Sequence, residues 1–157
     1  IQQSPQDTEL QFVRADLYQE YGRRNKEPKF LLLAQEQYEK IVLIDPKNQK
    51  AKALSIVCSA FHALFHEDAD RISESIYKSQ LLSEHLPVEL YAKGITLLCY
   101  GIYSSDLEEI QNAIYYFQRS TSIDRSFSLG WHYLGIAFFL LFEAVEHDRK
   151  KLSVSSG

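Results

Sequence analysis

The chain has 157 residues, of which 45% are hydrophobic and 24% are charged, and its net charge is −4. A chain of this size and composition can bury the core of a single folded domain, which excludes a disordered protein. Its mildly acidic balance argues against binding to nucleic acid or to an anionic membrane surface, because both require clustered cations. The chain begins with Ile1 and contains no Met, so we expect it to be part of a longer protein.

The pattern of apolar residues predicts an all-α chain. Gly and Pro are scarce, at six and four residues, and apolar residues recur at spacings of three and four along most of the sequence. Pro, Asp and Ser residues mark the boundaries between about seven expected helices. In chain order, these helices cover about residues 5–24, 28–44, 49–66, 70–84, 88–103, 106–124 and 127–152. The short segment 153–157 is expected to form a disordered tail.

Two of the expected helices have a well-marked apolar face. In the first helix, four apolar residues share one face, so we expect this face to be buried: Leu10, Val13, Leu17 and Tyr21. In the third helix a broader apolar stripe is formed by Ala53, Ile56, Val57, Ala60, Phe61 and Leu64. Both faces are therefore predicted to belong to the core.

Two short patterns repeat along the chain. A small residue followed four positions later by a larger one recurs every 39 or 40 residues, at Ala34 and Tyr38, Ser73 and Tyr77, and Ala113 and Phe117. A second pattern has a large residue, two variable residues, another large residue and then Gly. It occurs at residues 18–22, 97–101 and 131–135. A small residue lets a neighbouring helix approach closely, so the patterns indicate a repeated pair of packed helices.

These patterns resemble the tetratricopeptide repeat family, in which Trp-x2-Leu-Gly-x2-Tyr is followed by Ala-x3-Phe and then Pro over about 34 residues. The similarity is best over residues 34–46, 113–117 and 131–138. The chain departs from the family in its longer period, and in its second repeat Phe61 is expected at the Gly position. The resemblance implies a right-handed solenoid of helical hairpins in one domain, residues 1–152. Its repeats would cover about residues 15–48, 49–87 and 88–127, with a half repeat at 128–152.

A narrower resemblance covers part of the same region. Residues 90–94, 107–117, 123–124 and 128–138 resemble the repeat region of bacterial regulators that join a winged-helix or cyclase domain to tetratricopeptide repeats. This resemblance implies an alternative function, the sensory or regulatory segment of a bacterial transcriptional regulator or signalling protein. A winged-helix or cyclase domain preceding Ile1 would decide in its favour.

One group of residues could carry metal chemistry. Cys58, His62 and His66 follow one another at spacings of four, which places a thiol and two imidazoles on one helix face. Two His residues one turn apart can share a Zn²⁺ ion, but three positions along one helix seldom reach a single ion. The alternative interpretation is a polar inner face of a repeat helix. We expect no metal and no other cofactor.

The sequence contains no familiar catalytic motif. It has no Gly-x-Ser-x-Gly elbow, no His-Glu-x-x-His, no phosphate-binding Gly loop and no Cys-x-x-Cys. We therefore expect a protein that is not an enzyme, with a metal-binding or catalytic helical domain as the alternative. The two residues Cys58 and Cys99 leave the compartment and their own redox state open, and a cytoplasmic protein is expected.

The family resemblance implies where a partner would bind. In this family the first helix of each pair lines a concave groove, so the function expected is a scaffold or adaptor that holds a partner peptide or helix. The positions predicted to face the groove are Gln19, Arg23, Cys58, His62, Phe65, Leu98, Ile102, His132, Ile136 and Phe139. For Leu98, Ile102, Ile136 and Phe139 the alternative is burial in the core. Chaperone-binding members of the family hold the C-terminal carboxylate of a peptide with Lys and Asn. Here only Arg23 could pair with it, so this specificity is not expected.

The last expected helix is apolar on every side at residues 137–142, and no later helix covers it. We expect the chain to self-associate or to bind a helix there, so that the missing cover lies downstream of Leu152 or on another molecule. The longest apolar run, residues 136–142, is short of the roughly 20 residues that a bilayer requires. No membrane insertion is therefore expected.

Overall fold

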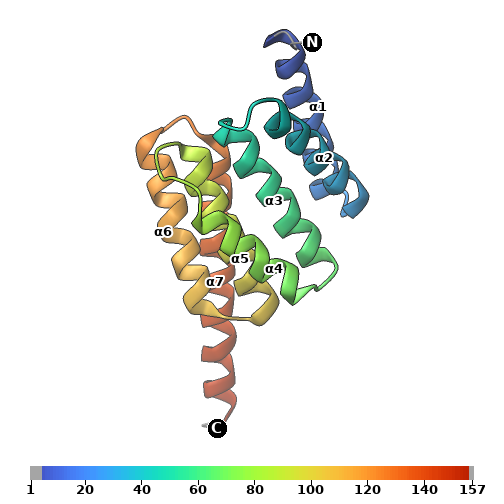
Figure 1. The fold of residues 1–157 in the computed structure, drawn as a ribbon. Helices are drawn as coiled ribbons and strands as arrows, with labels where there is room; N and C mark the ends of the chain where they lie inside the picture. The colour runs from blue at the N-terminus through green and yellow to red at the C-terminus, as the bar shows by residue number, and fades with distance from the viewer. Residues whose placement is uncertain (1–4, 156–157) are drawn as a thin grey trace.

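The computed structural model of the protein describes residues 5–155, and this part of the chain forms seven α-helices and no β-strand (Figure 1). The helices are α1 (Pro5–Arg24), α2 (Pro28–Ile44), α3 (Gln49–Phe65), α4 (Ala69–Gln80), α5 (Pro87–Ser104), α6 (Leu107–Ile123) and α7 (Ser128–Ser155). The predicted all-α chain is confirmed. α4 ends four residues earlier than predicted, and α7 continues through Ser153 and Val154 into the expected tail. The remaining tail residues, 156–157, lie outside the described part.

Local capping explains where most of the helices begin. The side chain of Asn48 accepts a hydrogen bond from the backbone N–H of Ala51 at 3.0 Å, at the start of α3. Asp68 and Asp106 play the same part at the starts of α4 and α6. These side chains satisfy backbone donors that have no partner inside the helix. α2 and α5 begin instead with a Pro, whose fixed φ suits the first helical turn.

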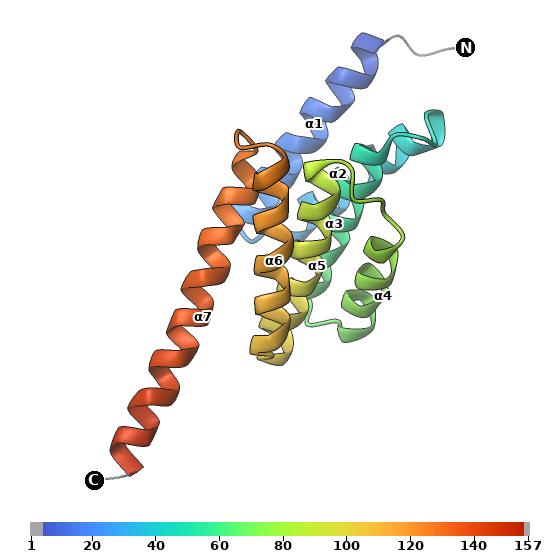
Figure 2. The ribbon, with the colours of Figure 1, turned by 90° about the vertical axis from the view of Figure 1, so that its left-hand side faces the viewer.

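The helices form two rows. Each even-numbered helix packs between the odd-numbered helices that precede and follow it in the chain, and α1, α3, α5 and α7 also contact one another in succession. Among the described residues, no two even-numbered helices are in contact. The rows can be followed in Figures 1 and 2, in which the C-terminal half of α7 projects beyond the other helices.

The three helical hairpins α1–α2, α3–α4 and α5–α6 have turns of the same type. Each turn contains a residue with a left-handed backbone: Lys26 (φ 52°), Glu67 (φ 51°) and Ser105 (φ 55°). Four residues earlier stand Gly22, Ala63 and Gly101, and the carbonyl of each accepts a bond from the N–H five residues on, at 2.9, 2.9 and 3.0 Å. This corrects the expected alignment, because Ala63 and not Phe61 stands at the Gly position of the second hairpin.

The register of α4 also differs from the prediction. Ser73 and Tyr77 were expected to pack as a small and a large residue, but both are exposed, Tyr77 by 64%. The buried residues of α4 are Ile72, Ser75 and Ser79. Because two of these are polar, the apolar pattern of the sequence points to the wrong face of this short helix. The buried hydroxyls are satisfied locally, because Ser75 donates to the carbonyl oxygen of Arg71 at 2.9 Å and Ser79 donates to that of Ile76 at 2.8 Å.

The predicted buried face of α1 is wrong as well. Its four apolar residues, Leu10, Val13, Leu17 and Tyr21, are 50–65% exposed. The helix packs instead through the buried residues Ala15, Gln19 and Gly22, with the partly buried rings of Phe12 and Tyr18 beside them. Ala and Gly allow a close approach, and the two rings contact aromatic residues of α2, so this face buries apolar surface as well. The predicted stripe of α3 is confirmed for five of its six residues, which are buried.

Candidate binding cavity

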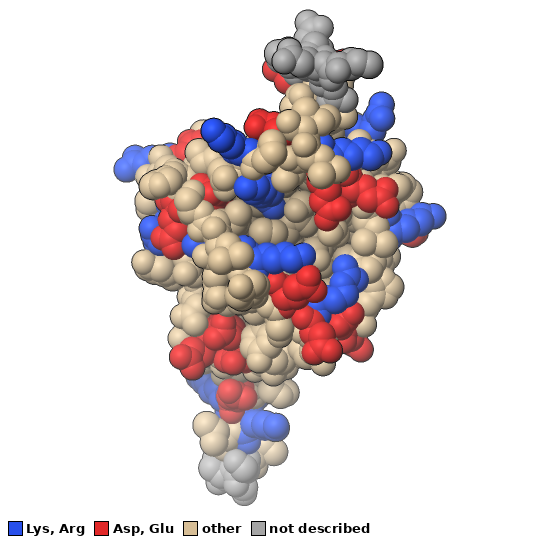
Figure 3. All heavy atoms as spheres, in the orientation of Figure 1, with Lys and Arg blue, Asp and Glu red and all other residues tan. Residues whose placement is uncertain are grey.

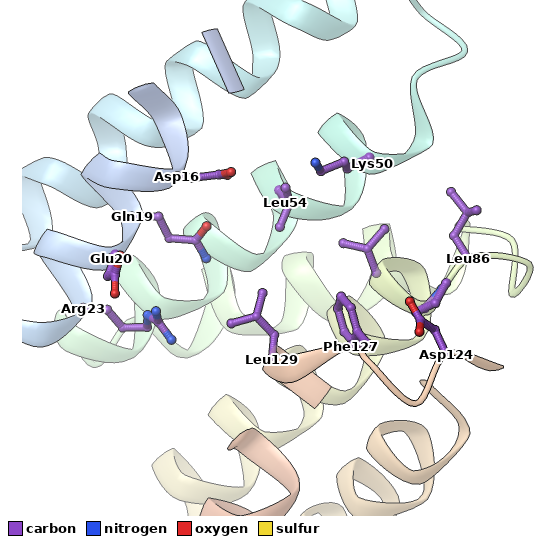
Figure 4. Close-up of a pocket in the computed structure, with 12 residues that line it drawn as sticks. Asp16, Gln19, Glu20, Arg23, Lys50, Leu54, Leu86, Asp124, Phe127 and Leu129 are labelled. Atoms are coloured by element: carbon purple, nitrogen blue, oxygen red, sulfur yellow. The ribbon is translucent and has the colours of Figure 1, made fainter. Parts of the chain in front are cut away.

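A cavity of about 540 Å³ opens between the odd-numbered helices. One side is formed by α1, and the base by the first turns of α3 and α5 (Figure 4). The opposite side is formed by the α6–α7 loop and the first turn of α7, so residues more than 100 positions apart face each other across it. Its lining residues are Asp16, Gln19, Glu20, Arg23, Lys50, Leu54, Leu86, Pro87, Val88, Asp124, Phe127 and Leu129.

The cavity combines an apolar base with charged walls. Leu54, Val88 and Phe127 supply apolar surface, whereas Asp16 and Glu20 supply carboxylates. On the face of the molecule drawn in Figure 3, acidic and basic side chains lie interspersed. A site of this kind can bury an apolar group and orient it by charge.

The charged residues of the cavity do not have equal access to a ligand. The Nζ atom of Lys50 lies 4.6 Å from the centre of the Phe12 ring, so this cation already makes a cation–π contact within the protein. Asp16 accepts a hydrogen bond from the hydroxyl of Tyr38. Asp124 accepts bonds from the N–H and hydroxyl of Ser126, the hydroxyl bond first, and both lower the pKa of its carboxyl group. The Asp124 carboxyl group is therefore ionised at neutral pH.

Arg23 links the two ends of the chain across the cavity. Its guanidinium group donates a hydrogen bond to the hydroxyl of Tyr133 on α7 and lies 5.5 Å from the centre of the same ring. A second cavity of about 470 Å³ is lined by Glu20, Arg24, His132 and neighbouring residues. Arg23 lines both cavities and connects α1 to α7.

A cluster of aromatic rings lies behind this link. The Tyr133 ring lies 5.8 Å from the rings of Phe61 and Tyr91 and 6.2 Å from the ring of Phe117. Within the described part of the chain, the buried hydroxyl of Tyr91 and the Nε atom of Arg23 have no hydrogen-bond partner. Burial raises the pKa of both Tyr91 and Tyr133, so both hydroxyls are neutral donors.

The structure divides the ten predicted groove residues into four groups. Gln19 and Arg23 line the first cavity and His132 lines the second. Cys58, His62 and Leu98 are buried in the core. Phe65 and Ile136 are partly buried against it, whereas Ile102 and Phe139 are exposed, by 41% and 61%. The cavity thus brings together two of the ten.

Most of the lining residues were not predicted. Asp16 and Glu20 lie on α1 next to the predicted positions, and Lys50, Val88 and Asp124 lie at helix ends. The prediction placed the groove along the middle turns of the odd-numbered helices. The cavity instead lies where the N-terminal parts of α3, α5 and α7 face α1. These residues come together because α1 and α7 lie on opposite sides of the cavity. A local sequence pattern contains no information about how far apart these two helices lie.

Cys58 and His62 lie on α3, and His66 is the C-cap residue of the same helix. Cys58 is fully buried, and burial raises the pKa of its thiol. Nδ1 of His62 lies 2.6 Å from Nη1 of Arg71, and burial followed by this guanidinium lowers the pKa of the imidazole. The His62 and His66 rings are 4.4 Å apart. No group of three or more metal-ligating side chains occurs in the described part of the chain.

α7 has a second property besides its contribution to the cavities. Residues 128–154 form a helix long and apolar enough to cross a membrane, with a mean hydropathy of 1.4 over 18 residues, of which 22% are buried. Its stretch without Asp, Glu, Lys or Arg, residues 128–142, is about 22 Å long. This is less than the hydrocarbon core of a bilayer, about 30 Å. Length and composition alone make this helix weak evidence for a membrane span.

Comparisons of the chain with protein-family models, with curated proteins and with solved structures find no match.

Proposed function

We propose that the protein is a non-catalytic recognition module of the tetratricopeptide type, a scaffold or adaptor that binds a segment of a partner protein between its odd-numbered helices. Three hairpins with one shared turn, packed in two rows, support this proposal. The observation that carries it is the cavity on the inner row, with an apolar base and charged walls. Such a site holds a side chain of an extended peptide better than it performs chemistry.

The charges favour a ligand that is apolar and basic. Three carboxylates line the cavity, those of Asp16, Glu20 and Asp124, against the two cations of Arg23 and Lys50. The carboxylates therefore outnumber the cations by one, although Glu20 also forms an ion pair with Arg24 at 2.8 Å. A Lys or Arg side chain next to a large apolar residue is the complementary ligand for this negative balance.

The test uses fluorescein-labelled peptides of twelve residues in three sets, apolar-basic, apolar-acidic and polar-neutral. Fluorescence anisotropy measures their binding to the full chain. We expect binding of the apolar-basic set, and a loss of about tenfold with Glu20→Lys, since a rim charge is reversed. Glu36→Lys is the matched control, because Glu36 is exposed on α2 and lies outside the cavity.

Two outcomes would contradict the proposal. Equal binding of all three sets would indicate non-specific adsorption. An equal loss with Glu20→Lys and Glu36→Lys would show that net charge, and not the cavity, governs binding.

A further inference from the structure

One face of α7 has no neighbouring helix in the described part of the chain, whereas the equivalent faces of α1 and α5 do. A methyl group added at Gly22 would lie 3.1 Å from the backbone nitrogen of Leu31 on α2. At Gly101 it would lie 3.2 Å from the backbone nitrogen of Ile110 on α6. Gly135 occupies the same place in the repeated sequence pattern of α7, yet nothing lies within 4 Å of that position. In the first and third hairpins the second helix covers this Gly, whereas among residues 5–155 no helix covers Gly135.

The chain beyond Gly135 does not turn back. Four residues after Gly22 and Gly101 the backbone is left-handed and the hairpin turns, at Lys26 and Ser105. The equivalent residue of α7, Phe139, is helical, and the helix continues to Ser155. Within the described chain, α7 therefore carries its uncovered face outward for its whole length.

That face is a heptad seam. Seven residues follow one another at alternating spacings of four and three: Trp131, Gly135, Phe138, Phe142, Val145, Arg149 and Leu152. All seven are exposed, and the five large apolar ones are exposed by 47–70%. A repeat with a mean spacing of 3.5 is the pattern by which two helices pair along their length. The core packs against another face of the helix, which includes Tyr133 and Ala137, so the seam is open to a partner.

We infer that the α7 seam pairs with the α7 seam of a second copy of this chain, antiparallel, in a twofold-symmetric dimer. The twofold axis passes close to Leu140. This inference is independent of peptide binding in the cavity, because none of the seam residues lines the cavity.

Antiparallel pairing follows from the order of side chains in the seam. About Leu140, Gly135 meets Val145 of the second copy, and Phe138 meets Phe142 of the second copy. The gap left by a Gly is then filled by a branched side chain, and aromatic residues face each other in the central layers. Trp131 meets Arg149 of the second copy, a pair suited to cation–π contact.

The parallel arrangement is less favourable at two layers. It would place Gly135 against Gly135 of the second copy, which leaves a void in the seam. It would also place Arg149 against the same cation of the second copy. The antiparallel pair avoids both.

The area available fits a second copy. The antiparallel overlap covers residues 128–152 of each copy, about 37 Å of helix. The exposed aromatic and Val side chains offer roughly 400 Å² per copy, if an aromatic side chain contributes about 200 Å² when fully exposed. Two copies would bury about 800 Å² of apolar surface, and because about a third of an interface is polar, the total comes near the lower limit of stable interfaces, about 1,200 Å². A dimer that dissociates on dilution is expected.

Sedimentation velocity of the full chain over a range of concentrations tests the association. We expect a monomer that converts to a dimer as the concentration rises, and a loss of at least about 100-fold in association with Phe142→Glu, which places a carboxylate in two symmetric layers. The matched control is Tyr77→Glu, because Tyr77 is similarly exposed, by 64% against 61%, but lies on α4. A chain that stays monomeric throughout, or a dimer that survives Phe142→Glu, overturns the inference.

Disulfide trapping tests the direction of the pair. The two native thiols, Cys58 and Cys99, are fully buried and do not interfere. Gly135→Cys and Val145→Cys change open or exposed positions, so both variants are expected to fold. When they are mixed and mildly oxidised, the antiparallel pair gives the mixed disulfide dimer. If each variant instead links to itself and no mixed product exceeds chance, the parallel arrangement is present and the inference is wrong.

A membrane is the competing occupant of the same face. Flotation with phosphatidylcholine vesicles separates the two, because a dimer with a covered seam stays with the soluble fraction. Flotation of the full chain that Phe142→Glu abolishes and Tyr77→Glu leaves intact would assign the seam to a lipid surface and overturn the inference.

Discussion

The α5–α6 hairpin and α7 share the pattern of large residues that ends in a Gly, and they differ in what this Gly and their aromatic residues pack against. In the hairpin, Gly101 lies against α6, and the Phe117 side chain is completely buried. In α7, Gly135 has open space beside it, and Phe138 is 47% exposed. A repeat pattern therefore specifies a helix and a face, but the energetic weight of each residue depends on whether a partner helix is present.

The largest difference is expected at the aromatic residues. Phe117→Ala should lower the free energy of unfolding by about 3–5 kcal/mol, because it opens a cavity at the centre of the core. Phe138→Ala should lower it by less than about 1 kcal/mol at low protein concentration, because its ring is half exposed. Urea denaturation followed by circular dichroism measures both. Equal losses would mean that α7 is covered in the monomer and would remove the contrast.

The glycines should show opposite signs. A methyl group at Gly101 would lie 2.7 Å from a side-chain carbon of Ile110 and 3.1 Å from the carbonyl oxygen of Asp106, so Gly101→Ala should destabilise the protein by about 1–3 kcal/mol. Gly135→Ala meets nothing and gains helix propensity, so it should stabilise the protein by up to about 1 kcal/mol. Melting temperatures of the two variants at one low concentration check the signs. Destabilisation by Gly135→Ala would show that a neighbour already occupies that space.

The helices were predictable because their signals are local. Pro28 and Pro87 begin helices, and Asp106 caps one through its own side chain. Such interactions involve residues within one turn of each other, so the sequence alone contains them. The Gly positions of the first and third hairpins are local in the same sense, since they depend on a turn four residues away.

The buried faces were predictable only where hydrophobicity and packing agree. On α3 they agree. On α1, Ala15 and Gly22 are buried while Leu17 stays exposed, because closeness of approach decides the contact. On α4 the buried positions include Ser75 and Ser79, which no apolar pattern can reveal. These faces depend on neighbouring helices, and therefore on contacts distant in the sequence.

The cavity was the least predictable feature. One of its walls is Arg23 on α1, which donates a hydrogen bond to Tyr133 on α7, 110 residues further along the chain. That contact depends on the summed angles of every helix between them, and small errors in each angle accumulate. Arg23 and Gln19 were found because they lie on the inner face of a helix that was correctly placed. Asp124 and Phe127 were missed because loops carry no periodicity.

The smallest contrast concerns ion pairs at the junction of the hairpins and on α7. Glu84, just before α5, accepts hydrogen bonds from Arg119 on α6 and from Lys93 on α5, the latter at 3.2 Å. The bond from Arg119, followed by that from Lys93, lowers the pKa of this carboxyl below its usual 4.5. A lowered pKa means that the folded state favours the ionised form, so the stabilisation is present above pH 4.5 and is lost as the pH falls through the folded-state pKa.

Glu84→Gln should therefore destabilise the protein slightly at pH 7, and its unfolding curve should converge with that of the wild type in acid. The effect is small because the side chains of Glu84 and Arg119 are each 36% exposed, so solvent screens their attraction. Glu146→Gln on α7 is the control, since its partner Arg149 is 3.6 Å away and 80% exposed. Urea titrations between neutral and acid pH measure both variants. Destabilisation by Glu84→Gln that persists unchanged in acid would mean that packing, and not the charge of Glu84, holds this junction.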